Sequence, residues 1–261
     1  MTEMELLVDF HKDADRQGPG STADTLKALS FIDLPRETPL KVADIGCGTG
    51  AQTITLAQHI AGHITAVDLF PEFLDQLNRR AQEIGVQDKI TTLEKSMDAL
   101  DFDAETFDIV WSESAVYIMG FEAGVKQWRN FLKPGGYLAV SEITWLTNTR
   151  PEEIEAHWNS EYPQIDTAAG KMKVLEAHGF SPVGYFILPH SSWIENYYRP
   201  MEGRFEAFLQ KHNHSKMARA QVEADRDEIE KYRRFKDYFS YGFYVAKKVS
   251  DGDDDEYHYN Y

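Results

Sequence analysis

The 261-residue sequence contains a single cysteine, Cys47, and this scarcity excludes two classes of protein. An internal disulfide needs two cysteines, and a multi-cysteine zinc site needs more. The chain also lacks any apolar run near the roughly 18 residues that a membrane-spanning helix requires. Its first segment, 1–13, carries acids where a secretory signal carries bases. We therefore expect a cytoplasmic protein.

Positive charge is also scarce. The sequence has 27 Lys and Arg residues and 43 Asp and Glu residues, which gives a formal net charge of −16. Nucleic-acid binding depends on clustered Lys and Arg that displace counterions, and the sequence shows no such stripe. We expect no nucleic-acid partner and no membrane insertion. Five of the acids lie in segment 251–261, whose composition favours a disordered, solvated tail over a functional acidic tail.

Short apolar runs alternate with helical patterns in most of the chain. Helical spacing, with apolar positions three and four apart, occurs in segments 52–60, 71–85 and 124–132. The strand-like runs are 40–45, 63–69, 89–94, 107–112, 136–143, 179–188 and 241–248. Such alternation predicts an α/β fold with a doubly wound, mostly parallel sheet that is covered by helices on both faces.

We expect one domain over residues 1–250. Segment 1–39 predicts two helices, with Ser21 as the N-cap of the second, and 40–189 forms the core around the sheet. Segment 190–237 is too long for a passive connection. It is charged and helical in pattern, and we predict a cap over the ligand end of the sheet, before the last strand within 238–250.

Three glycines, Gly46, Gly48 and Gly50, alternate directly after the first predicted strand. Glycines let the backbone pass close to a ligand, and the helix that follows presents free N–H groups and its positive dipole end. Asp68 ends the next predicted strand, at a distance that suits a carboxylate accepting hydrogen bonds from two ribose hydroxyls. The two features together predict a nucleoside-containing cofactor.

The spacing of these glycines separates two kinds of cofactor. A dinucleotide site has the pattern G-x-G-x-x-G, whereas this loop is D-I-G-C-G-T-G, in which Asp44 precedes the glycines. The pattern resembles motif I of class I S-adenosylmethionine-dependent methyltransferases, and the resemblance extends over residues 40–145. It implies S-adenosylmethionine as cofactor and a Rossmann-like sheet of seven strands whose last strand is antiparallel.

The resemblance also assigns cofactor contacts. Asp68 matches the family's ribose-binding acid, and Leu69 follows it. Segment 95–102 is similar to the part that places adenine, where Ser96, Met97 and Asp98 would lie beside the base. Segment 105–117, which contains Ser112, resembles the fourth-strand motif that leads to the methyl donor. Segment 131–142 is similar to the turn and fifth strand of the family.

Segment 16–21, RQGPGS, precedes the glycine loop. In related enzymes such a segment folds over the methionine end of the cofactor, which would place Gly18 there and bring Arg16 to its carboxylate, since a guanidinium suits bidentate pairing. The alternative is an ordinary turn between two helices, because Gly-Pro-Gly is typical of turns.

Two residues after the fourth predicted strand are candidates for catalysis. Glu113 could orient an amine or act as a base, as could Glu142 after the fifth strand; the alternative is a carboxylate bonded to nearby backbone N–H groups. Tyr117 is expected to line the site near the donor methyl; the alternative is that its ring only packs against its neighbours. Aromatic rings in the insertions attract cations. We hypothesise that some of them form a lid, the alternative being core packing: Trp193, Tyr197 and Tyr198.

The closest resemblance is to small-molecule methyltransferases, among them largely uncharacterised bacterial relatives of quinone, sterol and cyclopropane-lipid enzymes. It implies methyl transfer by in-line displacement to an amine, hydroxyl or lipid-like acceptor. The N-P-P-Y or D-P-P-Y motif of adenine-directed enzymes is missing, and a second cysteine for cytosine or arsenite chemistry is missing too. Another sulfonium reaction, such as lipid cyclopropanation, and a non-catalytic cofactor-binding protein both stay open.

We expect neither the cysteine nor the histidines to take part in the reaction. Cys47 follows the first glycine near a helix N-terminus, where a thiol pKa can fall, but direct transfer to an acceptor uses no thiol, so we interpret it as packing. The nine histidines show no helical metal-ligand spacing with a third partner, and we predict no metal. The sequence leaves a homodimer open.

Overall fold

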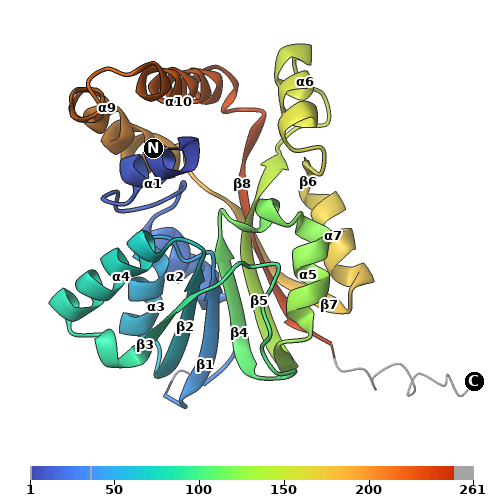
Figure 1. Cartoon of the computed structure of the whole chain (residues 1–261). Helices are drawn as coiled ribbons and strands as arrows, with labels where there is room; N and C mark the ends of the chain where they lie inside the picture. Colours follow the sequence, from blue (N-terminus) through green and yellow to red (C-terminus); the bar gives the residue numbers. More distant parts are fainter. Residues whose placement is uncertain (1, 36, 250–261) are drawn as a thin grey trace, which may run out of the picture.

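The computed structural model describes residues 2–35 and 37–249, and its centre is one mixed sheet (Figure 1). Strand order is β3-β2-β1-β4-β5-β8-β7, with β6 paired to β5. The strands are β1 (Leu40–Ile45), β2 (Gly62–Asp68), β3 (Ile90–Glu94), β4 (Phe107–Glu113), β5 (Leu132–Trp145), β6 (Asp166–Thr167), β7 (Phe180–Ile187) and β8 (Phe239–Lys248).

The pairing confirms the predicted fold class. Strands β1 to β5 pair in parallel, and β8 runs antiparallel to both of its neighbours, β5 and β7. The two-residue strand β6, which pairs with the end of β5, was not predicted. Residues 166–167 are too few to show an alternating pattern. The seven longer strands all fall on predicted apolar runs.

Helices cover both faces of the sheet (Figure 1). Helices α2 (Thr22–Ser30), α3 (Ala51–His59) and α4 (Pro71–Ile84) lie on one face, and α5 (Phe121–Arg129) and α7 (Ala168–Ala177) lie on the other. Local chemistry sets their ends. The Ser21 hydroxyl accepts from the Asp24 N–H as the predicted N-cap, and α4 begins with Pro71 and ends at Gly85, whose φ is +80°.

A further group of helices gathers over one end of the sheet, where Figure 1 shows α1, α9 and α10 together. Together with the ends of β5 and β8 they share an apolar core of their own, which includes Phe10, Trp193, Phe205 and Tyr232. These elements are α1 (Glu3–His11), α6 (Glu152–Glu161), α8 (His190–Trp193), the π-helix η3 (Ile194–Tyr198), α9 (Arg199–Lys211) and α10 (Lys216–Phe235).

Segment 190–235 is therefore helical almost throughout, as its pattern predicts, and we refer to it as the cap. Two short 3₁₀ turns, η1 (Gln87–Lys89) and η2 (Val116–Ile118), complete the described elements. No helix in the described ranges is long and apolar enough to span a membrane. The predicted acidic tail, 251–261, lies outside the described residues.

Candidate functional site

The glycine loop joins β1 to α3, and its three glycines adopt positive φ angles of +74°, +55° and +87°. Side chains from other segments press against it. A Cβ on Gly46 would lie 2.5 Å from Cβ of Ala115, and a Cβ on Gly48 would lie 2.6 Å from Cγ of Gln17. Both the conformation and the close approach require glycine at these positions. The side chains of Ala115 and Gln17 thus fill the space that side chains at these positions would need.

Asp68 ends β2 beside this loop. Its carboxylate accepts hydrogen bonds from the backbone N–H groups of Gly48 (2.8 Å) and Phe70 (3.1 Å). Burial raises the pKa of Asp68, and these N–H groups oppose the shift. Since each carboxylate oxygen carries two lone pairs, Asp68 keeps acceptor capacity for the hydroxyls of a ligand.

Asp68 and the loop border a cavity of about 560 Å³, called here the cofactor cavity. The volume falls within the range of small-molecule sites, roughly 300–1,000 Å³. Residues from the sheet end, from α1 and from the cap enclose it. The predicted site residues that line it are Gly46, Gly48, Asp68, Leu69, Ser96, Met97, Glu113 and Tyr117.

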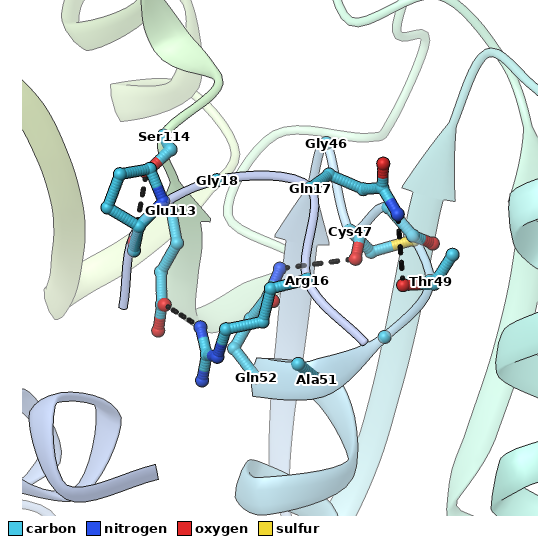
Figure 2. A pocket seen from close by; sticks show the side chains of 13 residues that line it. Arg16, Gln17, Gly18, Gly46, Cys47, Thr49, Ala51, Gln52, Glu113 and Ser114 are labelled. Atoms are coloured by element: carbon cyan, nitrogen blue, oxygen red, sulfur yellow. Dashed lines mark hydrogen bonds and ion pairs between the residues drawn. The ribbon is translucent and has the colours of Figure 1, made fainter. Parts of the chain in front are cut away.

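Three other predicted residues, Arg16, Gly18 and Gly50, line a smaller space between the glycine loop and segment 16–19 (Figure 2). Gly50 is the N-cap of α3, and a Cβ there would run into Leu77. Gly18 lies so close to Ser114 that an added Cβ would come within 2.7 Å of its Cβ. These glycines shape the loop and the chain that crosses it.

The last three predicted cofactor residues line none of these cavities. Asp44 is fully buried under the loop, where it accepts from Thr53 Oγ1 (2.5 Å), and burial raises its pKa to about 7. Ser112 is buried and donates to the Ile45 carbonyl (2.8 Å). Asp98 is exposed and accepts from the Ser96 hydroxyl (2.5 Å). Direct cofactor contact by these residues stays a prediction.

Arg16 and Glu113 face each other in Figure 2. Arg16 Nη1 donates to Glu113 Oε2 (3.1 Å), while Thr25 Oγ1 (2.7 Å) and Trp111 Nε1 (3.0 Å) donate to Oε1. Three donors from three segments thus hold the Glu113 carboxylate, which is 8% exposed. The contacts favour Glu113 as an anchor for segment 16–21, and its predicted catalytic role stays untested.

Segment 14–20 is bound across the glycine loop by contacts that the sequence did not reveal. The Gln17 amide donates to Thr49 Oγ1 (3.2 Å), and that hydroxyl donates to the Ala14 carbonyl (2.9 Å). Arg80 of α4 donates to the carbonyls of Ala14 (3.1 Å) and Asp15 (3.1 Å). Segment 16–21 is therefore more than a turn between two helices, since it forms a wall of the site.

Ser114 is a further residue that sequence reasoning missed. It follows β4 with φ of +55°, a conformation that is uncommon for a residue other than glycine. Its N–H donates to Ser141 Oγ (2.8 Å), which offsets part of that cost. The side chain lines both the cofactor cavity and the space beneath the loop. A strained residue at such a position is typical of functional sites.

A second cavity, about 520 Å³, lies between the sheet end and the cap, and we call it the acceptor cavity. Aromatic residues are the largest group in its lining, which also contains three carboxylates. The two cavities have five lining residues in common, which mark where they meet: Gln17, Ser114, Tyr117, Tyr197 and Glu228. Tyr117 thus lies at the junction, as expected for a residue near the point of transfer.

The three aromatic residues predicted as a lid all line the acceptor cavity, but two of them belong to the core of the cap. Trp193 is 3% exposed and stacks on Tyr232 with ring centroids 4.3 Å apart, and Tyr198 is 1% exposed. Removing such a side chain costs about 3–5 kcal/mol. Alanine at either position would therefore test folding, and Tyr197 is the better probe of ligand contact.

Cys47 is buried, and its Sγ lies 3.7 Å from the Gly48 carbonyl oxygen. Burial raises the pKa of the thiol, and the charges of Asp44 and Asp68 add to the effect. The thiolate, which is the reactive form, is therefore disfavoured. Within the described residues no group of three or more His, Cys, Asp or Glu side chains could hold a metal ion.

Known proteins similar to this chain agree with the geometry of the site. Residues 42–136 match the family model described as methyltransferase domain. The segment is a methyltransferase domain. Enzymes of this family use S-adenosylmethionine, the cofactor that the glycine spacing predicts. The matched range includes the glycine loop, Asp68 and Tyr117, so it supplies most of the cofactor cavity.

The domain is similar in sequence to two curated proteins. The erythromycin 3''-O-methyltransferase of Saccharopolyspora erythraea is 38% identical over 113 residues, which cover 42% of this chain and 37% of that protein. YjhP of Escherichia coli is 28% identical over 156 residues, which cover 59% of this chain and 62% of YjhP. The chain thus spans less than two thirds of both relatives, and their substrates do not transfer to it.

The fold extends the likeness beyond the methyltransferase domain. The solved structure of YjhP has a TM-score of 0.79 at 22% identity and covers 94% of this chain and 100% of that chain. A methyltransferase of Geobacter sulfurreducens, solved in complex with S-adenosyl-L-homocysteine, has a TM-score of 0.81 at 17% identity and covers 93% and 97%. At these identities the likeness concerns the fold.

Proposed function

We propose that the protein transfers a methyl group from S-adenosylmethionine to a small-molecule acceptor. The observation that carries this proposal is the meeting of the two cavities at Ser114 and Tyr117. One cavity has the features of a nucleoside site, and the other has room for a separate small molecule. A transferase needs this arrangement, because its two substrates must meet at one point.

The residues of the cofactor cavity fit S-adenosylmethionine. Asp68 offers carboxylate oxygens for ribose hydroxyls, and Gly46 and Gly48 line the same cavity without side chains. The side chains of Leu69 and Met97 supply apolar walls for a planar base. These contacts come from the ends of three neighbouring strands, β1, β2 and β3, where open α/β sheets bind their ligands.

The bound cofactor supplies an electrophilic methyl group on a sulfonium. The protein's contribution is to hold the acceptor in line and to exclude water. Segment 14–20, which Thr49 and Arg80 hold in place, covers the site next to the glycine loop. The cap covers the acceptor cavity. Enclosure in the cavity raises the pKa of Tyr117, and Glu228 adds to the shift. Its hydroxyl therefore stays protonated and is available as a hydrogen-bond donor rather than as a base.

Titration calorimetry with S-adenosylmethionine, S-adenosylhomocysteine and NAD tests the first half of the proposal. We expect both sulfur compounds to bind and NAD to fail. Asp68→Asn should weaken S-adenosylhomocysteine binding about 10- to 100-fold, as loss of hydrogen bonds to a charged group implies. Asp88→Asn, an exposed site in η1, should leave binding unchanged. Binding of NAD alone would contradict the proposal.

Incubation with a labelled methyl donor and fractionated metabolite pools tests the second half. We expect label in a small-molecule fraction, and Tyr117→Ala should lower its rate of formation more than it lowers cofactor affinity. Tight cofactor binding without transfer to any pool would favour a non-catalytic binding protein. Label in a cyclopropane product would point to the lipid reaction.

A further inference from the structure

Aromatic rings form a large part of the walls of the acceptor cavity. Rings come from α6, from the cap and from β8, and Tyr117 adds one from the sheet end. In the described part of the chain, the hydroxyls of Tyr117, Tyr197 and Tyr241 have no hydrogen-bond partner. Their oxygens are therefore free to accept from a ligand. Aromatic faces together with free phenol oxygens form surroundings that favour a cation.

Charge in the cavity lining is unbalanced. The carboxylates of Glu161, Asp227 and Glu228 face one ammonium, that of Lys231. His157 also lines the cavity, but burial lowers its pKa, and Lys231 lowers it further. The imidazole is therefore neutral near pH 7. Lys231 balances one of the three carboxylates, and the lining keeps an excess of negative charge.

Glu228 is the carboxylate nearest the point of transfer, because it lines both cavities. Tyr198 donates to its Oε1 (2.9 Å) and so fixes its position on α10. No cation among the described residues comes within salt-bridge distance of it. The Glu228 side chain is exposed to the space of the cavity, where Lys231 acts on it without forming a salt bridge. A carboxylate that is fixed in position and has no salt-bridge partner attracts a positively charged ligand.

We propose that the acceptor cavity binds an organic ammonium group, with Glu228 as its counter-ion and the tyrosine rings and hydroxyls as its walls. This inference rests on the proposed function, since it names the acceptor of that reaction as an amine. The bound ammonium gives a proton to the Glu228 carboxylate, and the nitrogen lone pair then forms the N–CH₃ bond while the C–S bond breaks and S-adenosylhomocysteine leaves. The free oxygens of Tyr117 and Tyr197 are placed to accept from the N–H groups of such a ligand. A neutral acceptor gains no attraction to the charge of Glu228, and an anionic acceptor is repelled by it.

Two small molecules of equal shape test the inference directly. Choline carries a quaternary ammonium, and 3,3-dimethyl-1-butanol has a neutral carbon in its place. Titration calorimetry of the whole chain should show choline binding at least tenfold more tightly than the neutral compound. Glu228→Gln, which keeps the size of the side chain, should remove most of that difference. Glu223→Gln, an exposed site on the same helix, should preserve it.

The labelled-methyl assay adds a second readout, with matched panels of alkylamines and alcohols as acceptors. Label in amines supports the inference, and label in alcohols alone contradicts it. Choline binding no tighter than that of the neutral compound, including absence of binding by both, also overturns it. A separate titration with S-adenosylhomocysteine distinguishes the two proposals. If choline binds and S-adenosylhomocysteine does not, the cation site stands and the transferase function is rejected.

Discussion

Replacing Lys171 by methionine should leave a buried carboxylate without its counter-ion. The side chains of Lys171 and Glu142 are 3% and 0% exposed, and Nζ lies 3.2 Å from Oε1. Lys171 Nζ also donates to the carbonyl of Gln164 (2.6 Å). Burial raises the pKa of Glu142 and lowers that of Lys171, and each charge opposes the shift of the other. The pair is therefore stable only while both members are present.

The burial sets the size of the effect. An exposed ion pair contributes about 0–1 kcal/mol, whereas removing one member of a buried pair costs about 3–5 kcal/mol. At about 2–4 °C per kcal/mol, Lys171→Met should lower Tm by on the order of 10 °C. The loss should shrink at lower pH, because Glu142 then takes up a proton and needs no partner. Calorimetry and urea unfolding at two pH values measure both quantities.

A double-mutant cycle supplies the control. The combined variant, Glu142→Gln with Lys171→Met, buries no unpaired charge and should be more stable than Lys171→Met alone. Additive losses, or a loss below about 1 kcal/mol for the single variant, would refute this reasoning. Glu142 lines neither cavity, so the double variant should retain methyl transfer. Loss of transfer by a folded double variant would restore Glu142 as a catalytic candidate.

Three further predictions concern the glycine loop. Gly48→Ala should weaken S-adenosylhomocysteine binding at least tenfold, whereas Gly85→Ala, with a similar positive φ but open space around it, should lower stability alone. Cys47→Ser should keep most activity, and Cys47 should react with iodoacetamide only after unfolding, because burial raises its pKa. Asp44 has a pKa of about 7 in the folded state and about 3.8 in the unfolded state. The free energy of unfolding should therefore fall by up to about 4 kcal/mol as the pH rises between these two values. Asp44→Asn should not show this decline in urea unfolding.

Each of these predictions has a contrary outcome. Unchanged affinity in Gly48→Ala would mean that Gln17 moves aside without consequence for the ligand. Rapid alkylation of folded protein, or loss of turnover in Cys47→Ser with cofactor binding intact, would make Cys47 a chemical participant. An equal decline of stability with pH in Asp44→Asn would assign that decline to other groups.

Features with a local signature were predictable from the sequence. The glycine loop and Asp68 each follow a strand of the parallel sheet, and both border the cofactor cavity. The antiparallel last strand came from a family resemblance, because periodicity alone does not give strand direction. Asp44 and Ser112 belong to the same motifs but point into the core, since alternate residues of a strand face opposite sides.

The junction of the cavities was not predictable by the same means. Gln17, Ser114 and Glu228 come from segments about a hundred residues apart, and no pattern along the chain links them. Glu228 lies on a long, charged helix and is exposed like most acids of that helix, so no sequence pattern distinguishes it from them. Arg16 has the predicted location beside the loop, but its partner in the structure is Glu113, a residue that we considered for catalysis.

The most direct test of the account is a crystal structure of the protein with S-adenosylhomocysteine. We predict that the ribose hydroxyls bind Asp68, that the base lies beside Leu69 and Met97, and that the sulfur faces Tyr117 at the junction of the two cavities. A ligand bound in the acceptor cavity, or one whose sulfur points away from Tyr117, would contradict the central claim.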